Sequence, residues 1–473
     1  MGAMELSRAI RSGAVSCVET MSAYLDRIAA LNPRVNAVVS LRDPDTLLAE
    51  ARARDDQLAR GEAVGPLHGF PHAVKDLELT AGIRTTFGSP LFRDFVPEQD
   101  SLQVGRLKRA GAIIVGKTNT PEFGLGSHTF NDVFGATRNP YDHGRSAGGS
   151  SGGAGAALAL RMVPLADGSD HAGSLRNPAA WNNLFALRPS PGLVPAGRPE
   201  LFLQSPSVMG PMARAIPDLA VLLSVQAGAE PSEPLSRPVD PNGFLAALDA
   251  DVAGWRLGWL RDLGGYLPFE PGVLDLCEAA LHRLAALGCD IEPAAPAFAM
   301  DRLWRDWLTL RAWHVANGQA ANYRDPARRA SLKPELIWET ERGLQLAAGD
   351  VAEASIGRSD WYRAIARLFE RFDFLLLPSA QLFPFPVEWR WPQEIAGRKM
   401  DTYHRWMETC IVVTMSGCPA LNVPVGFEGR GLPMGMQIVA PIGQEFRLLQ
   451  LAHAYDQATR WIEKHPPPRA KEV

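Results

Sequence analysis

The stretch GRSAGGSSGGAGAALALRMVPLADGSDHAGSLRNPAA, residues 144–180, is rich in glycine and serine and lies between apolar helix and strand signals. Glycine lets backbone N–H groups approach a ligand closely, and runs of such N–H groups hold phosphates or oxyanions. Serine side chains inside such a cradle are candidate nucleophiles. A flexible linker has a similar composition, but it lacks the flanking apolar elements. We therefore interpret residues 144–180 as the scaffold of an active site.

Two short patterns in this part of the chain match known loops. GAIIVGKT (111–118) fits the phosphate-loop pattern, but its Ala-Ile-Ile-Val middle favours a strand over a loop that wraps phosphates. GGSSG (148–152) fits the nucleophile elbow of α/β hydrolases, in which a strand precedes the serine. NPYDHGRSA (139–147) does not have the pattern of a strand. An α/β-hydrolase-like esterase, with His404 or His453 as its base, stays an alternative.

Strand and helix signals alternate on both sides of the stretch, which is typical of an α/β sheet. AIIVG (112–116) and FDFLLLPS (372–379) have the pattern of buried strands, and EFRLLQLAHAYDQAT (445–459) that of a final amphipathic helix. The simplest architecture is one α/β core built from both ends of the chain, with a helical segment laid over it. We predict a single domain over residues 1–473, with N-terminal helices in 1–64, the core in 65–225, a variable helical segment in 226–371 and the C-terminal part of the core in 372–473.

The composition argues against several functional classes. The 473 residues carry a formal net charge of -4, which supplies no basic field for nucleic acid. The five cysteines are odd in number and form no C-x-x-C pair, which argues against a disulfide framework and a structural zinc site. The N-terminus lacks the apolar region of a signal peptide, and no apolar run approaches the roughly 18 residues of a membrane span. We expect a cytoplasmic protein with no nucleic-acid or membrane partner, no metal and no cofactor.

Seven segments share their order and spacing with one known family. They are GFPHAVKDLELTAGIRTTFGS (69–89), GKTNTPEFG (116–124), FGATRNPYD (134–142), GGSSGG (148–153), DGSDHAGSLRNPAA (167–180), GPMARAIPDLA (210–220) and GCPALNVPVGFEGRGLPMGMQIVAP (417–441). Together they resemble the amidase signature, and the resemblance covers nearly the whole chain, with the helical middle matching least. It implies a single large mixed β-sheet flanked by helices, with a central helical insertion. It also implies an amidohydrolase that acts on carbon–nitrogen bonds other than peptide bonds.

In that family a lysine, a serine that follows a cis peptide bond and a second serine form the catalytic relay. The resemblance assigns these roles to Lys75, Ser150 and Ser174. Ser174 would attack the carbonyl carbon and form an acyl-enzyme. Lys75 would act as the base in its neutral form, because burial lowers the pKa of a lysine from its ordinary value of roughly 10.4. Ser150 would pass the proton between them.

The turn that leads to the nucleophile supplies the oxyanion hole in this family. The resemblance assigns that role to the backbone N–H groups of His171, Ala172, Gly173 and Ser174. The family commonly has Gly-Gly-Ser where this chain has Ala-Gly-Ser, and we interpret the alanine as the mark of a subfamily with the relay kept. Asp170 and Arg176 are predicted to brace the turn through hydrogen bonds without touching the substrate.

The sequence indicates the substrate only by class. By analogy Phe123 and Leu125 border the pocket, and His72 is predicted to line it. The candidates for an apolar rim are Trp304, Trp307, Trp313, Trp389 and Trp391. Such a rim favours a small hydrophobic or aryl amide, an ester or, as in a urethanase, a carbamate.

Within the family, the alternative function is that of the A-type subunit of a glutamyl-tRNA amidotransferase, which works in a complex and passes ammonia to a partner. The His171-Ala172 turn and the tryptophan-rich middle of the chain disfavour this alternative. We expect a small-molecule amide, ester or carbamate as the partner of the site, and we allow for a homodimer.

Overall fold

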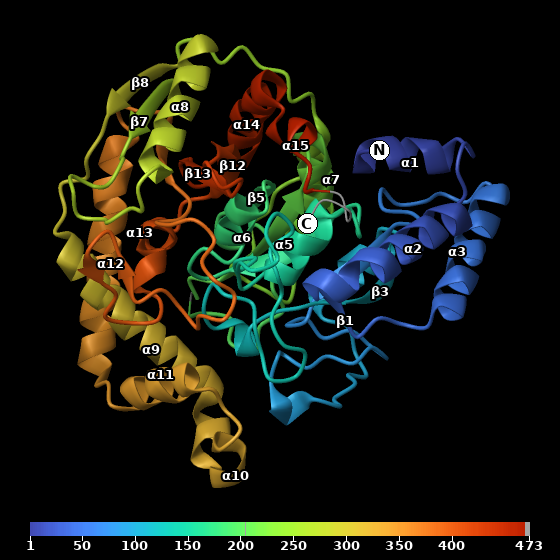
Figure 1. The fold of residues 1–473 in the computed structure, drawn as a ribbon, viewed down its shortest axis with the longest axis horizontal. Helices are drawn as coiled ribbons and strands as arrows, with labels where there is room; N and C mark the ends of the chain where they lie inside the picture. The colour runs from blue at the N-terminus through green and yellow to red at the C-terminus, as the bar shows by residue number, and fades with distance from the viewer. Residues whose placement is uncertain (204, 469–473) are drawn as a thin grey trace.

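The computed structural model describes residues 1–203 and 205–468. Its centre is an eight-stranded sheet in the order β4-β6-β5-β12-β13-β9-β7-β8. In Figure 1, β5 lies beside β12, so segments far apart in the chain are neighbours in the sheet. The eight strands span, in sheet order, Ala166–Asp170, Val208–Ala213, Phe185–Arg188, Ala420–Phe427, Pro433–Val439, Phe374–Pro378, Arg256–Trp259 and Asp290–Pro293.

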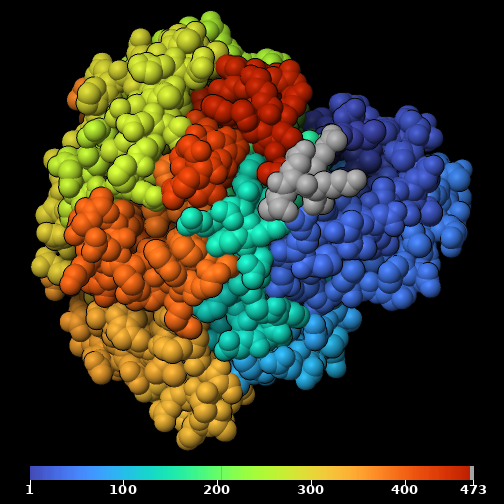
Figure 2. Space-filling model, in the orientation of Figure 1, coloured from blue at the N-terminus to red at the C-terminus, as the bar shows by residue number. Residues whose placement is uncertain are grey.

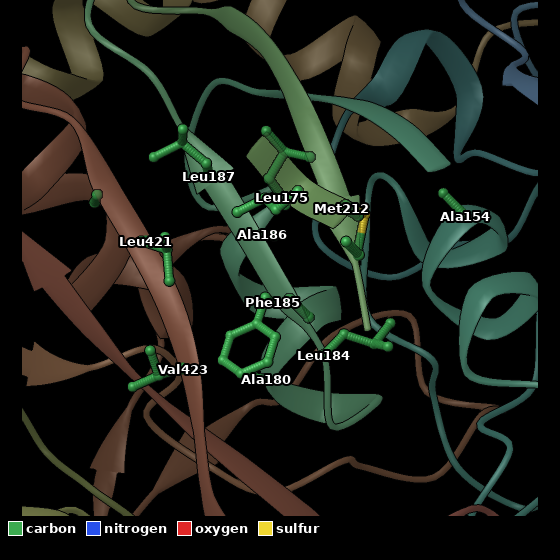
Figure 3. Close-up of a cluster of buried hydrophobic side chains, with 14 of the residues drawn as sticks. Ala154, Leu175, Ala180, Leu184, Phe185, Ala186, Leu187, Met212, Leu421 and Val423 are labelled. Atoms are coloured by element: carbon green, nitrogen blue, oxygen red, sulfur yellow. The ribbon is translucent and has the colours of Figure 1, made fainter. Parts of the chain in front are cut away.

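The eight-stranded sheet is mixed. β12 runs antiparallel to β13 and to β5, which places Leu421 opposite both Ile438 and Leu187. β7 runs parallel to both β8 and β9. Figure 3 shows side chains of β5 and β12, among them Phe185 and Val423, meeting in the buried core. The central strands are buried along almost their whole length, so their apolar residues form continuous runs. The predicted α/β fold, a large mixed sheet flanked by helices, is confirmed.

A second, smaller sheet, which the sequence did not predict, carries Lys75. Its strand order is β1-β3-β2, with β1 at Val38–Val39, β3 at Ile113–Thr118 and β2 at Pro71–Lys75. β2 also contacts β4 of the large sheet, but no ladder joins the two strands. Where the two strands meet, the Lys75 N–H donates to the side chain of Asp167 on β4, at 3.3 Å.

Helices cover the sheets, and Figure 1 shows α1–α3 at one end of the molecule and α9–α12 at the other. Local signals fix where they begin and end. At the start of α2, the Ser16 hydroxyl accepts the Glu19 N–H at 3.0 Å, and the Glu19 carboxylate accepts the Ser16 N–H at 2.8 Å. At its end Asn36 adopts the left-handed conformation, with φ 53°. The helices up to α7 are α1 Ala3–Arg11, α2 Cys17–Val35, α3 Pro44–Ala59, η1 Pro90–Phe92, α4 Leu102–Arg109, η2 Glu122–Gly124, α5 Gly152–Ala159, α6 Arg176–Trp181 and α7 Ile216–Gln226.

The segment 226–371, predicted to be a helical insertion, is mostly helical but also supplies two strands, β7 and β8, to the large sheet. β7 lies between β9 and β8 with Leu257 fully buried, so this part of the segment belongs to the core. Figure 2 shows the segment along one side of the molecule, opposite the N-terminal helices. The remaining elements are η3 Pro241–Leu245, α8 Val273–Ala286, α9 Met300–Arg324, α10 Pro326–Arg329, α11 Pro334–Leu344, α12 Ala348–Leu368, β10 Glu394–Ile395, β11 Arg398–Lys399, η4 Arg405–Met407, α13 Glu408–Ser416, α14 Glu445–Thr459 and α15 Trp461–Lys464.

Within residues 1–203 and 205–468, none of the helices combines the length and the apolar character that crossing a membrane requires. Residues 469–473, the end of the predicted C-terminal part of the core, lie outside the described residues.

Candidate active site

Lys75 is the last residue of β2, and its amine lies in a buried cluster of three serine hydroxyls. Lys75 Nζ is 2.8 Å from Ser150 Oγ, 2.9 Å from Ser151 Oγ and 3.0 Å from Ser169 Oγ. The lysine is only 1% exposed. A charged ammonium donates three hydrogen bonds, whereas a neutral amine also offers a lone pair to one of the hydroxyls. The cluster can therefore accommodate both protonation states of the lysine.

The surroundings of Lys75 favour its neutral form. Burial lowers the pKa of Lys75 to about 7, although the carboxylates of Asp167 and Asp170 oppose the change. A group with a pKa near 7 can accept a proton and return it at neutral pH, which is what general acid–base catalysis requires.

Ser150 lies at the start of the glycine-rich turn before α5, and the Gly149–Ser150 peptide bond is cis. The turn needs glycine at position 148, where φ is 76° and a Cβ would lie 2.9 Å from the Cα of Pro178. Ser127 anchors the turn by donating its hydroxyl to the Gly149 carbonyl at 2.6 Å. These contacts aim the Ser150 hydroxyl at Lys75.

Ser174 lies in the turn between β4 and α6, next to the lysine cluster. The N–H of Ser151 donates to the Ser174 carbonyl at 3.2 Å, which joins the two serine segments. In the described part of the chain, no hydrogen bond connects the Ser174 hydroxyl with that of Ser150. Ser174 is 7% exposed, so it is the more accessible of the two. Hydrogen bonds of a catalytic relay are often long in a ligand-free site and tighten when the substrate binds.

Asp170 holds the turn that precedes Ser174. Its carboxylate accepts the N–H of Gly173 at 2.9 Å and that of Leu175 at 3.2 Å. Arg176 donates to both carboxylate oxygens, at 2.8 and 2.9 Å, and Arg188 donates at 3.2 Å. Burial opposes ionisation of Asp170, but the charges of Arg176 and Arg188 outweigh it and hold the pKa of this carboxyl well below its usual range.

The hydrogen bond from Gly173 to Asp170 bears on the predicted oxyanion hole. The Gly173 N–H is already engaged, whereas the N–H groups of His171, Ala172 and Ser174 have no hydrogen-bond acceptor among the described residues. Gly173 instead provides the shape of the turn: its φ is 107°, and a Cβ there would lie 2.6 Å from the Cβ of Cys410. Three of the four predicted N–H groups are therefore available to an oxyanion.

We expect Asp170→Asn to lower the free energy of unfolding by about 3–5 kcal/mol, because it leaves two buried arginines without their anion. The lowered pKa means that this stabilisation is present above the ordinary carboxyl pKa of about 4 and is lost as the pH falls below it. Urea denaturation at pH 7 measures the effect. Asp360→Asn, which removes the anion from two solvent-accessible pairs, with Arg302 and Arg363, is the matched control and should cost less than about 1 kcal/mol per pair. Equal stability of the two variants would contradict the bracing role.

The loop after β3, which contains Phe123 and Leu125, borders the lysine cluster at Gly124. A Cβ on Gly124 would lie 3.4 Å from Ser150 Oγ, so this loop lies directly against that hydroxyl. Phe123 stacks on Phe87, and Leu125 packs with buried side chains of the central helical segment. His72 was predicted to line the pocket, but it is 1% exposed and its Nε2 lies 2.9 Å from Asp167 Oδ1. Because His72 faces β4, its contact is with Asp167 inside the protein.

The tryptophans differ in their relation to the site. Trp307 is fully buried, and its ring meets that of His171 edge to face at 5.5 Å, next to the predicted oxyanion turn. Trp304 packs against His404, and His404 in turn packs against Trp307. Trp304 therefore lies farther from the turn than Trp307 does. Trp313 and Trp391 are partly buried. Trp389 is half exposed and stacks on Phe385.

The structure weighs against the alternatives based on short patterns. Gly116, Lys117 and Thr118 lie inside β3, and Lys117 Nζ donates to the carbonyl of Glu78, so the GKT segment is not a phosphate loop. The residues before Ser150 do not form a strand, unlike those before a nucleophile elbow.

The histidines that an esterase mechanism would need are also engaged elsewhere. His404 Nε2 lies 3.1 Å from Glu339 Oε1, and His453 Nε2 lies 3.5 Å from Asp249. Among the described residues, Ser150 has Lys75 and not a histidine as its hydrogen-bond partner.

Sequence reasoning missed two members of the lysine cluster, Ser151 and Ser169. A signal for Ser169 existed, because Asp167 and Ser169 are two residues apart on β4 and so share one face of the strand. That face meets Lys75, since Asp167 binds its N–H and Ser169 binds its amine. Ser151 was not identified, because the role of this motif had been assigned to its neighbour Ser150.

Comparison with known proteins identifies a family. The family model Amidase matches residues 19–449. The A-type subunit of the glutamyl-tRNA(Gln) amidotransferase of Thermus thermophilus is 37% identical over 97% of each chain. An acylamidase of Rhodococcus erythropolis is 33% identical over 98% of this chain and 97% of its own. The crystal structure of a bacterial aryl acylamidase of the amidase signature enzymes superimposes with a TM-score of 0.94 at 27% identity, covering 100% of this chain and 99% of the other. The chain belongs to the amidase signature family of hydrolases, which act on carbon–nitrogen bonds other than peptide bonds.

Proposed function

We propose that the chain is an amidohydrolase that cleaves the C–N bond of a small hydrophobic or aryl amide through an acyl-enzyme on Ser174. The observation that carries the proposal is the buried hydrogen bond between Lys75 Nζ and Ser150 Oγ, together with the lowering of the Lys75 pKa to about 7. The proposal takes residues 1–473 as one amidase domain with the four parts predicted above, and the pairing of β5 with β12 supports a shared core.

In the acylation step, neutral Lys75 accepts the proton of Ser150, and Ser150 accepts that of Ser174. Ser174 Oγ then forms a bond to the substrate carbonyl carbon, and the carbonyl electrons move onto the oxygen. The N–H groups of His171, Ala172 and Ser174 stabilise this oxyanion. Collapse of the intermediate breaks the C–N bond, and the proton held by Lys75 returns through Ser150 to the leaving amine.

In the deacylation step, a water molecule replaces the amine. Lys75 accepts its proton through Ser150, the hydroxide attacks the ester carbonyl, and the proton returns to Ser174 Oγ. The products are a carboxylic acid and an amine, and the relay ends in the protonation state in which it began. The same steps fit an ester or a carbamate, because each presents a carbonyl carbon and a leaving group.

An apolar acyl or aryl group is favoured by the side chains around the site. Phe123, in the loop that borders Ser150, stacks on Phe87. Trp307 packs beside the turn before Ser174. Apolar and aromatic walls with few polar groups are typical of small-molecule pockets. The similarity to an acylamidase and to an aryl acylamidase agrees with this substrate class.

The second candidate is the A-type subunit of a glutamyl-tRNA amidotransferase. The observation in its favour is the 37% identity with the Thermus thermophilus protein over almost the whole length of both chains. In that case the same relay would release ammonia from an amide of glutamine type, and the chain would act together with partner subunits.

Hydrolysis of p-nitroacetanilide and release of ammonia from glutamine, measured on the purified chain alone, distinguish the two candidates. We expect kcat/KM for the anilide to be roughly 100-fold higher, which is the discrimination that an apolar pocket gives between substrates. Ammonia release that exceeds anilide hydrolysis, or that appears only with partner subunits, would support the amidotransferase function instead.

A further inference from the structure

A cleft of about 780 Å³ lies between α12, the adjoining face of α9 and the end of α13. Basic and hydroxyl side chains line part of it, including Arg358, His314, Tyr362 and Ser416. Leu310 and Trp313 of α9 add an apolar wall. The described residues that line the cleft include no aspartate or glutamate. A cavity with this lining favours a ligand that has an apolar part and a negative charge.

The cleft approaches the candidate active site at one residue of its lining. His314 lines it, and the ring of His314 meets that of His171 edge to face at a centroid distance of 6.1 Å. His171 in turn precedes the turn that carries Ser174. Burial, and then the charges of nearby arginines, lower the pKa of His314 to about 4, so this histidine is neutral at pH 7. The positive charge inside the cleft is therefore that of the arginines.

Arg358 is partly buried in this cleft, and within residues 1–203 and 205–468 it has no carboxylate partner. Its Nε donates to the Met415 carbonyl near the end of α13, at 3.2 Å, and its Nη2 lies near Gly417 on the cleft wall. No carboxylate among the described residues pairs with it, and burial lowers its pKa. The more deeply buried Arg176 and Arg311 do have one, at 2.8 Å in Asp170 and at 3.1 Å in Glu339. The partly buried Arg214 also has no carboxylate partner among the described residues, but it donates to the carbonyls of Leu158 and Val163. Among the described residues, Arg358 has a single recorded acceptor, the Met415 carbonyl, so the other donors of its guanidinium can bind an anion in the cleft.

We propose that Arg358 binds a carboxylate carried by the amide substrate, at the end away from the scissile bond. This inference rests on the proposed function, because the bound molecule is taken to be the substrate of the Ser174 site. The planar guanidinium suits a carboxylate, which it can bind through two parallel hydrogen bonds. The apolar wall of Leu310 and Trp313 would hold the spacer between the carboxylate and the amide. The substrate class is therefore an amide with a free carboxylate, such as the half-amide of a dicarboxylic acid or an N-acylated amino acid.

Two matched pairs of substrates test the proposal and locate the carboxylate. Adipoyl mono-p-nitroanilide and hexanoyl p-nitroanilide differ by a carboxylate on the acyl half. N-hexanoyl-4-aminobenzoate and N-hexanoylaniline differ by a carboxylate on the amine half. We expect the wild type to hydrolyse the acid of one pair with a kcat/KM roughly 10- to 100-fold above that of its neutral analogue, as for hydrogen bonds to charged groups. In Arg358→Gln, the ratio of kcat/KM for the acid to kcat/KM for its neutral analogue should fall to about one. Arg358→Lys should keep part of the preference for the acid.

Arg367→Gln is the matched control, because Arg367 lies on the same helix but outside the cleft lining. It removes the same charge and should keep the wild-type ratio. The proposal is overturned if the wild type favours neither acid, or if the preference survives in Arg358→Gln. Failure of the wild type to hydrolyse any of the four substrates, with no acyl adduct on Ser174, would count against the proposed function instead.

Discussion

Replacing Ser174 with alanine should lower kcat for p-nitroacetanilide by at least about 10,000-fold, because the attacking oxygen is lost and no acyl-enzyme can form. Intact-mass measurement with a slowly hydrolysed p-nitrophenyl ester should show one acyl adduct on the wild type and none on the variant. The fold should survive the change, since alanine differs from serine only by the hydroxyl, and the thermal midpoint checks this.

Ser150→Ala is the comparison that tests this assignment. It keeps the nucleophile and removes the proposed proton path, so it should react slowly yet still form the adduct on Ser174. The opposite pattern, with an active Ser174→Ala and an inert Ser150→Ala, would make Ser150 the nucleophile and restore the α/β-hydrolase interpretation.

Replacing Lys75 with methionine should lower kcat/KM by about 100- to 10,000-fold, the contribution of general acid–base catalysis. It should also change the pH profile. Burial lowers the pKa of Lys75 to about 7, and the neutral amine is the proposed base. Wild-type kcat/KM should therefore rise about tenfold per pH unit below 7 and level off above it. The variant should lack this limb of the profile.

Lys117→Met is the matched control for this prediction. Lys117 is also fully buried, on the neighbouring strand β3, and burial lowers its pKa to about 8, but it contacts Thr80 and Glu78 and not the serine cluster. Its replacement should leave the shape of the pH profile unchanged, even if stability falls. A wild-type profile that is flat between pH 5.5 and 8 would show that Lys75 is not the titrating base.

Much of the fold could be predicted from the sequence because the relevant signals are local. The apolar run in residues 372–379 indicated β9, and the periodic pattern in 445–459 indicated α14. The strand β8 was harder to recognise, because it has only four residues inside a helical segment. The place of β7 beside β9 depends on residues far away in the chain.

The residues of the candidate site were predicted unevenly. Lys75, Ser150 and Ser174 each lie in a short motif, so the sequence alone was enough to name them, and their roles stay predictions that the variants above test. Ser169 could not be named, because its role as a partner of Lys75 arises where β4 meets β2. Arg358 carried no motif, and its unpaired charge is visible only when its neighbours are known.

The sequence by itself therefore determined the family, the main strands and helices and the three residues of the proposed relay, since these follow from motifs and periodic patterns a few residues long. Only the tertiary structure decided which hydroxyls surround the Lys75 amine and how far its pKa falls. It also decided that His72 faces Asp167 and that Gly173 gives its N–H to Asp170. The physical reason is that desolvation and hydrogen bonding depend on every atom packed around a group, and most of those atoms belong to distant parts of the chain.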